Sequence, residues 1–233
     1  MGLGRGRLEL PVRILTIRRI PIRLHASFLW LAGALVGWQL LRSGLPAAVD
    51  AVGLGLMVFG SVILHELGHA LVGRLFGIQT RDITLYPFGG VARMEVARMR
   101  PWPEIVVSLA GPFVNLLMVG VGLALSALGA SFGLELALLN LGLGLFNLLP
   151  AYPMDGGRVL RAAMSLREDP ATATLKSLRV AQVFAWLFVG VGLLGGAWSL
   201  SLVGGFMLLT TRMERQRWER VLAMRKAGAL PHG

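Results

Sequence analysis

The sequence predicts an all-α membrane protein, a bundle of six transmembrane helices with small β-hairpin elements near its cytoplasmic side. The first observation is composition: 55% of the 233 residues are hydrophobic and only 15% are charged, whereas a soluble domain would carry about 25% charged residues. The second is that the apolar residues gather in runs long enough to approach the thickness of a bilayer. The third is that basic residues are concentrated in alternate spacers between these runs, which is typical of multi-pass membrane proteins.

Five apolar runs define the expected helices. Basic residues are concentrated before the first run and after the second, fourth and fifth runs, whereas the other two spacers carry little or no charge. By the positive-inside rule the basic segments lie in the cytoplasm, so both termini are expected there. The five runs are Ala26–Leu41, Val49–Leu64, Ile105–Leu128, Leu134–Leu149 and Val180–Thr211.

The last run, Val180–Thr211, has basic segments on both sides and must therefore cross the membrane an even number of times. Its 32 residues are many for one crossing, since a single span needs about 20 residues. Gly195-Gly196 near its centre is expected to form a turn between two short helices. This interpretation brings the number of spans to six.

A single domain is expected to occupy residues 1–233. It comprises a cytoplasmic N-terminal segment (1–25), the six spans (26–211) and a cytoplasmic tail (212–233). The N-terminal segment is rich in arginine up to Arg23, and no small-residue cleavage site follows a short apolar core. We therefore do not expect a cleavable signal peptide.

One spacer breaks the helical pattern and predicts a β-hairpin over Thr80–Val96. Polar and apolar residues alternate in Asp82–Pro87 and again in Val91–Val96, and Gly89-Gly90 between them can turn. An ordinary cytoplasmic loop is the alternative. A weaker alternation predicts a similar hairpin over Arg13–Ile22.

The absence of cysteine and the distribution of positive charge exclude several classes of function. Without cysteine, the chain has no disulfide, no thiolate metal ligand and no cysteine nucleophile. The net charge of +11 follows the topology of the spacers and indicates contact with the anionic headgroups of the lipid bilayer. No basic patch interleaved with aromatic residues accompanies this charge, so nucleic acid is not an expected partner.

The sequence His65-Glu66-Leu67-Gly68-His69 lies in the most apolar part of the chain, directly after the second run. Residues four apart lie on one face of a helix, so the two histidines can bind one zinc ion. Glu66 then lies beside the remaining coordination position as a candidate general base. Ionisable residues at membrane depth are costly and are candidates for function. A chance occurrence of the motif on an ordinary helix is the alternative.

The third ligand of such a site is expected to be a carboxylate. Of the other two histidines, His232 lies in the polar tail and His25 lies at the first membrane entry, where an interfacial role is expected. Asp155 is our candidate, because the prolines and glycines around it forbid a regular helix and can turn a carboxylate inward. Capping of the following helix is the alternative role for Asp155, and Glu104 and Glu95 are alternative ligands.

Taken together, these motifs resemble those of the site-2 protease family of intramembrane zinc metalloproteases, in its short branch without a PDZ domain. The resemblance rests on His65–His69 in one apolar run, and on Asn147-x-x-Pro150 followed by Asp155-Gly156-Gly157 after a later one. It extends to Tyr86–Gly90 and to Ala110–Asn115, and covers nearly the whole chain. Met154 stands where the family commonly has leucine, a conservative change that keeps the adjacent aspartate.

The resemblance implies one zinc ion per chain and a role for each residue of the motifs. Glu66 would activate water, and Asn147 would hold the substrate carbonyl or the oxyanion. Asn115, Gly89 and Gly90 would bind the substrate backbone. The implied zinc ligands are His65, His69 and Asp155.

The implied function is cleavage of peptide bonds within or near transmembrane segments of single-span membrane proteins, for example membrane-anchored regulators. The implied location is the cell membrane of a bacterium or an archaeon. The sequence shows no PDZ-like insertion between the spans and no CBS pair after Gly233, although the short branch that it resembles often carries a CBS pair. Either the protein lacks this module or the sequence is truncated, so its regulation is left open.

Three other functions are open at this point. An ion transporter or channel could use histidine, glutamate and aspartate side chains as an ion site. A catalytically inactive relative could act as a binding protein, although the retained Glu66 argues against this. A different membrane metalloprotease could use a glutamate such as Glu104 as its last zinc ligand.

Overall fold

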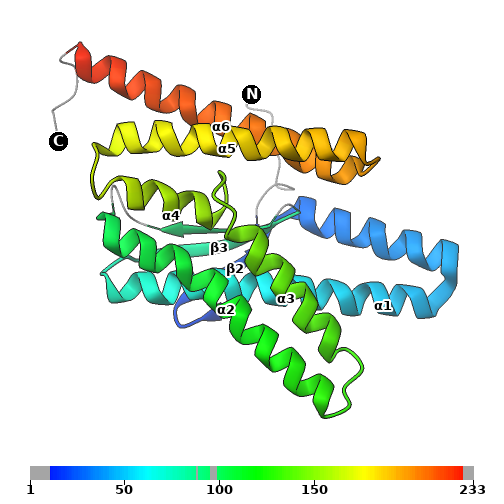
Figure 1. The fold of residues 1–233 in the computed structure, drawn as a ribbon. Helices are drawn as coiled ribbons and strands as arrows, with labels where there is room; N and C mark the ends of the chain where they lie inside the picture. Colours follow the sequence, from blue (N-terminus) through cyan, green and yellow to red (C-terminus); the bar gives the residue numbers. More distant parts are fainter. Residues whose placement is uncertain (1–10, 88, 95–98, 228–233) are drawn as a thin grey trace, which may run out of the picture. The chain divides into compact units, whose positions relative to one another are not determined.

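The computed structural model describes residues 11–87, 89–94 and 99–227. The chain forms two compact units, each built from two stretches of sequence. The first unit contains residues 1–98 and 113–142, and the second contains residues 99–112 and 143–233. Helices make up most of the described chain, and one small sheet accompanies them (Figure 1).

A four-stranded sheet lies in the first unit, with the strand order β1-β2-β3-β4. Strands β1 and β2 pair antiparallel, as do β3 and β4, so both predicted hairpins are confirmed. Parallel pairing of β2 with β3 joins the two hairpins into one sheet, which the alternation pattern did not predict. The strands are β1 (Val12–Ile17), β2 (Ile20–Leu24), β3 (Thr80–Tyr86) and β4 (Gly89–Met94).

Helix α1 (Ala26–Leu75) is a helical hairpin that connects β2 to β3. The helical dihedral angles are interrupted at Gly44, whose φ of 81° suits a residue without a side chain. The two arms then run side by side, as Figure 1 shows, and the rings of Phe28 and Phe59 meet with centroids 4.1 Å apart. The hairpin provides the long crossover that parallel strands require.

The second arm of α1 packs on the sheet through small and aliphatic side chains. Leu67 and Ala70 form a buried cluster with Ile20 of β2 and Ile83 of β3, and Ile63 packs against it. Complete burial of one aliphatic side chain of this size contributes about 1.5–3 kcal/mol. The sheet therefore fixes the rotation of the helix that carries the histidine motif.

Helices α2 (Pro101–Ala127) and α3 (Gly133–Asn147) approach each other backbone to backbone in the first unit. A Cβ atom added at Gly122 would lie 2.6 Å from the backbone nitrogen of Ala137, which is too close for any side chain. Small residues at helix contacts permit this approach, as is common in membrane proteins.

The second unit contains helices α4 (Asp155–Met164), α5 (Pro170–Leu194) and α6 (Trp198–Lys226). Helices α5 and α6 lie side by side (Figure 1) and are joined through Gly195 and Gly196, so the predicted turn is confirmed. Their core includes Ala181, Ala185 and Met207, all at most 1% exposed.

Three of the described helices are long and apolar enough to cross a membrane, namely α1, α2 and α5. Helix α3 is apolar but has only 15 residues, and α6 joins an apolar first half to a strongly charged second half. Large apolar side chains on these helices face outward: Trp30, Leu56 and Val183 are 77%, 72% and 68% exposed. Such surfaces would be unfavourable in water and indicate a membrane protein.

Candidate metal centre

The two histidines of the motif lie one turn apart in the second arm of α1 and are both buried. His65 and His69 are 6% and 3% exposed, and their Nε2 atoms lie 3.1 Å apart. Two imidazoles bound to one tetrahedral zinc ion at about 2.0–2.1 Å would place these nitrogen atoms about 3.4 Å apart. The pair therefore fits one zinc ion with little movement of either ring.

Packing on the sheet directs these histidines away from it. Leu67 and Ala70 lie on the face of α1 that contacts the sheet, and in a helix with 3.6 residues per turn His65 and His69 lie on the opposite face. The sequence His-Glu-Leu-Gly-His thus combines two candidate ligand positions with one apolar anchor. The predicted proximity of the two histidines is confirmed.

Glu66 lies on a third face of the helix, against strand β4. A Cβ atom added at Gly90 would lie 2.7 Å from Cγ of Glu66 and 3.1 Å from Cγ1 of Val62. Strand β4 therefore runs directly over Glu66, and a side chain at position 90 would push against it. Gly89, the preceding residue of the strand, has a φ of 136° that favours glycine.

Asn115 of α2 is 1% exposed and contacts His65 directly, with its Oδ1 2.5 Å from His65 Nδ1. Its amide nitrogen donates to Oδ1 of Asn140 of α3 at 2.9 Å. The amide nitrogen of Asn140 in turn donates to Oγ of Ser61 and to the carbonyl oxygen of Leu136, each at 3.0 Å. A continuous buried chain of hydrogen bonds therefore begins at the first histidine of the motif.

Sequence reasoning missed Asn140 and Ser61, although both left a signal. Asn140 is a polar residue inside an otherwise apolar run, where polar side chains are expensive and mark functional candidates. Ser61 precedes His65 by four residues and so lies on the same face of the helix.

Asp155 lies in the second unit as the first residue of α4 and is 8% exposed. The predicted break before it is confirmed, because α3 ends at Asn147 and α4 begins at Asp155. Met154 occupies the N-cap position of α4. Asp155 is therefore the first residue of the helix rather than its N-cap.

The two glycines after Asp155 are required by a close approach of the backbone. A Cβ atom added at Gly157 would lie 2.5 Å from the carbonyl oxygen of Ala151, and one at Gly156 would overlap the carbonyl oxygens of Leu148 and Leu149. The segment between α3 and α4 is thus folded tightly onto the start of α4. This contact holds the backbone of Asp155 in place.

Asn147, the last residue of α3, is half-buried in the second unit. Its amide nitrogen donates to the carbonyl oxygen of Leu143 at 3.0 Å. The amide has a second N–H and a carbonyl oxygen that this bond does not use. Asn147 can therefore still bind a peptide group.

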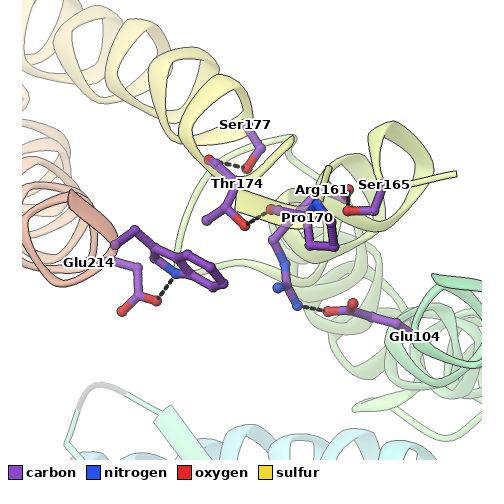
Figure 2. Close-up of polar contacts among 8 residues, drawn as sticks. Glu104, Arg161, Ser165, Pro170, Thr174, Ser177 and Glu214 are labelled. Atoms are coloured by element: carbon purple, nitrogen blue, oxygen red, sulfur yellow. Dashed lines mark hydrogen bonds and ion pairs between the residues drawn. The ribbon is translucent and has the colours of Figure 1, made fainter. Parts of the chain in front are cut away.

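The other candidate ligands named from the sequence have different contacts. Glu104 is 5% exposed and forms an ion pair with Arg161 of α4, so its carboxylate already has a cationic partner (Figure 2). His25 is the N-cap of α1, where its Nδ1 accepts from the Ser27 amide at 3.2 Å. Glu95 and His232 lie outside the described residues.

Comparison with known proteins shows the family to which this sequence is similar. The sequence model of Peptidase family M50 matches residues 54–136 and 130–190. A zinc metalloprotease of Methanocaldococcus jannaschii is 34% identical over 212 residues, which cover 87% of this chain and 60% of that protein. Stage IV sporulation protein FB of Bacillus subtilis is 29% identical over 189 residues, which cover 77% of this chain and 62% of that protein.

A solved structure has the same fold. The site-2 protease from Methanocaldococcus jannaschii matches with a TM-score of 0.67 and 33% sequence identity, covering 88% of this chain and 95% of that one. The chain spans about 60% of the length of two of the curated relatives that it matches.

Proposed function

This chain belongs to Peptidase family M50, and on that premise we propose that it is an intramembrane zinc metalloendopeptidase. Its proposed reaction is hydrolysis of peptide bonds within or near transmembrane segments of membrane proteins. The observation that carries this proposal is the buried pair His65 and His69, whose Nε2 atoms lie 3.1 Å apart on an apolar helix with Glu66 between them in sequence.

The proposed zinc ligands are His65, His69 and Asp155, one ion per chain. Two neutral imidazoles and one carboxylate are a common set for a catalytic zinc, which keeps its fourth position for water or substrate. All three residues are buried, and the described chain offers no cysteine in their place. The ion pair with Arg161 argues against Glu104 as the third ligand.

The residues of this site divide the hydrolysis between them. Zinc, when bound, supplies a Lewis acid that polarises the scissile carbonyl and lowers the pKa of a water molecule. Glu66 accepts the proton of the attacking water and delivers it to the leaving amine. Asn147 donates from its remaining N–H to the oxygen that becomes negatively charged.

The proposed topology has six spans and both termini in the cytoplasm. The spans are the two arms of α1, then α2, α3, α5 and the apolar first half of α6. Arg74 is the first charged residue after Glu66 and follows His65 by nine residues, which places the histidine about 14 Å from the cytoplasmic end of that arm. Cleavage is therefore expected near the cytoplasmic end of the substrate segment, in a multi-pass protein of the cell membrane.

The proposed substrates are single-span membrane proteins, such as membrane-anchored regulators. A peptide bond in an intact helix is shielded by the helix, so the substrate must unwind locally before hydrolysis. In the described sheet, β4 pairs with β3 on one side and its other edge is at the end of the strand order. An extended segment can add to that edge through backbone hydrogen bonds. Gly90 of β4 lies against Glu66, which supports cleavage beside this strand.

A cleavage assay in lipid vesicles tests the proposal. We expect the zinc-loaded chain to cut a single-span model substrate, and Glu66→Gln to retain zinc but lose at least about a hundredfold in rate, because an amide cannot accept the proton. The transporter alternative predicts ion flux that depends on Glu66 and no cleavage in either protein. Cleavage by Glu66→Gln at the wild-type rate would exclude Glu66 as the base.

A further inference from the structure

Four buried polar side chains from three helices form one chain of hydrogen bonds in the first unit. From Ser61 of α1 it passes to Asn140 of α3, then to Asn115 of α2, and it returns to α1 at His65. The exposed fractions of Ser61, Asn140 and Asn115 are 2%, 0% and 1%. At such depth an unpaired amide is costly, so the direction of each hydrogen bond is constrained.

A backbone carbonyl sets the direction of the whole chain of bonds. The oxygen of Leu136 can only accept, and it lies 3.0 Å from one end of the Asn140 amide. That end must therefore be the NH₂ group, and the oxygen of Asn140 must face Asn115. Asn115 then presents its own NH₂ group to Asn140 at 2.9 Å and its oxygen to His65 at 2.5 Å.

The tautomer of His65 follows from this direction. An acceptor oxygen faces Nδ1, so Nδ1 carries the hydrogen and the lone pair of the ring is on Nε2. Nε2 is the atom that lies 3.1 Å from the second histidine. The opposite tautomer would place a hydrogen on Nε2 and prevent it from binding a metal ion.

We propose that Asn140 and Ser61 are positioning residues that hold His65, through Asn115, in the tautomer and rotation that bind metal. The inference rests on the proposed zinc site and adds three residues to it. It also gives Asn115 a different role from the substrate contact implied by resemblance, because both ends of its buried amide bind protein groups. Outer partners of metal-binding histidines typically change metal affinity by about 10- to 100-fold.

The zinc dissociation constant of the full chain in detergent, measured by competition with a chelator, tests this role. Asn140→Leu is close in volume but removes the acceptor for Asn115, whose amide can then rotate and turn its NH₂ group toward His65. We expect zinc to bind about 10- to 100-fold more weakly in this variant. Asn140→Asp in its protonated form keeps an oxygen facing Asn115 and an O–H facing the carbonyl oxygen of Leu136, and should recover most of that affinity.

The two substitutions separate positioning from packing. If Asn140 only fills space, the buried carboxyl of Asn140→Asp should be at least as harmful as leucine, and this result would overturn the proposal. Ser61→Ala removes the oxygen that accepts from Asn140 and should weaken zinc binding. Ser177→Ala is the matched control, because Ser177 is a buried serine of α5 that donates to the carbonyl oxygen of Thr174, and its loss should leave zinc binding unchanged. Thermal unfolding of the metal-free proteins reports any loss of fold separately.

A failure of the proposed metal site would give a different pattern of zinc affinities from a failure of the positioning role. If His65→Ala binds zinc as tightly as the wild type, the metal site itself is wrong. If His65→Ala loses zinc but Asn140→Leu binds it with unchanged affinity, the site stands and the positioning role is wrong.

Discussion

Consecutive residues of the motif face three different neighbours, and this division explains why each residue type is needed. His65 contacts the amide of Asn115, Glu66 lies under Gly90, and Leu67 packs into the cluster on the sheet. A helix turns by about 100° per residue, so three adjacent side chains can reach three separate surfaces. One short segment thereby joins a proposed metal ligand, a proposed general base and an apolar anchor.

Gly90→Ala is expected to lower the cleavage rate while zinc is retained. The added methyl would lie 2.7 Å from Cγ of Glu66, so the base must move, and displacement of a catalytic group by about 1 Å can cost a hundredfold in rate. The measurement is kcat on a single-span substrate together with zinc content. Gly60→Ala, in the same helix as Glu66 and with nothing near its added Cβ, is the matched control. Equal rates for the two variants would contradict the placement of β4 over Glu66.

At the scale of elements, the sequence predicted the helices and both hairpins because their signals are local. Apolar runs, Gly195-Gly196 and the alternation in Asp82–Pro87 each lie within one stretch of chain. The parallel pairing of β2 with β3 could not be predicted in this way, because it joins segments separated by the whole of α1. The last two helices are also longer than predicted. Helix α5 begins before Val180 and α6 continues past Thr211, in charged sequence that hydropathy does not detect as helix.

The candidate site was likewise predicted only as far as local sequence signals reach. The motif spacing predicted that His65 and His69 lie together, since a helix fixes that geometry by itself. The bonds among Asn115, Asn140 and Ser61 depend on how three helices pack and are not encoded in any local spacing. The role of Asp155 as a ligand stays a prediction from chemistry and resemblance.

The tight segment before α4 should respond to a single methyl group. In Gly156→Ala the new Cβ would overlap the carbonyl oxygens of Leu148 and Leu149, which are backbone atoms and cannot rotate away. We expect a loss of about 1–3 kcal/mol in stability and weaker zinc binding, because Asp155 must move with the backbone. Thermal unfolding and zinc competition measure the two effects. Gly205→Ala in α6, with open space at its Cβ, should change neither, and a harmless Gly156→Ala would contradict the described packing.

At the scale of the whole molecule, the charge pattern predicts an orientation in the membrane, and the exposed apolar side chains indicate which surfaces face lipid. The spacers rich in arginine are expected in the cytoplasm, and the uncharged turn between α2 and α3 outside. Exposed side chains on the helices, such as Trp30 and Leu56, are those that lipid would cover. The proposed topology of six spans with both termini inside agrees with both observations.

Single cysteines introduced into this cysteine-free chain can test that topology without background. Ser131→Cys lies in the exposed turn between α2 and α3 and should react with an impermeant reagent added outside. Ser165→Cys, at the end of α4, should react only after the cytoplasmic side is opened. The reverse pattern would overturn the orientation and, with it, the expectation that substrates are cut near their cytoplasmic ends.

Zinc content of purified variants tests the central claim most directly, because it asks which side chains hold the metal. We predict about one zinc ion per chain in the wild type and also in Glu104→Ala, because the carboxylate of Glu104 pairs with Arg161 and is not a proposed ligand. We predict a large loss of zinc in His65→Ala, in His69→Ala and in Asp155→Ala. Full zinc retention in both His65→Ala and Asp155→Ala, or its loss in Glu104→Ala with Asp155→Ala unaffected, would contradict the proposed metal centre.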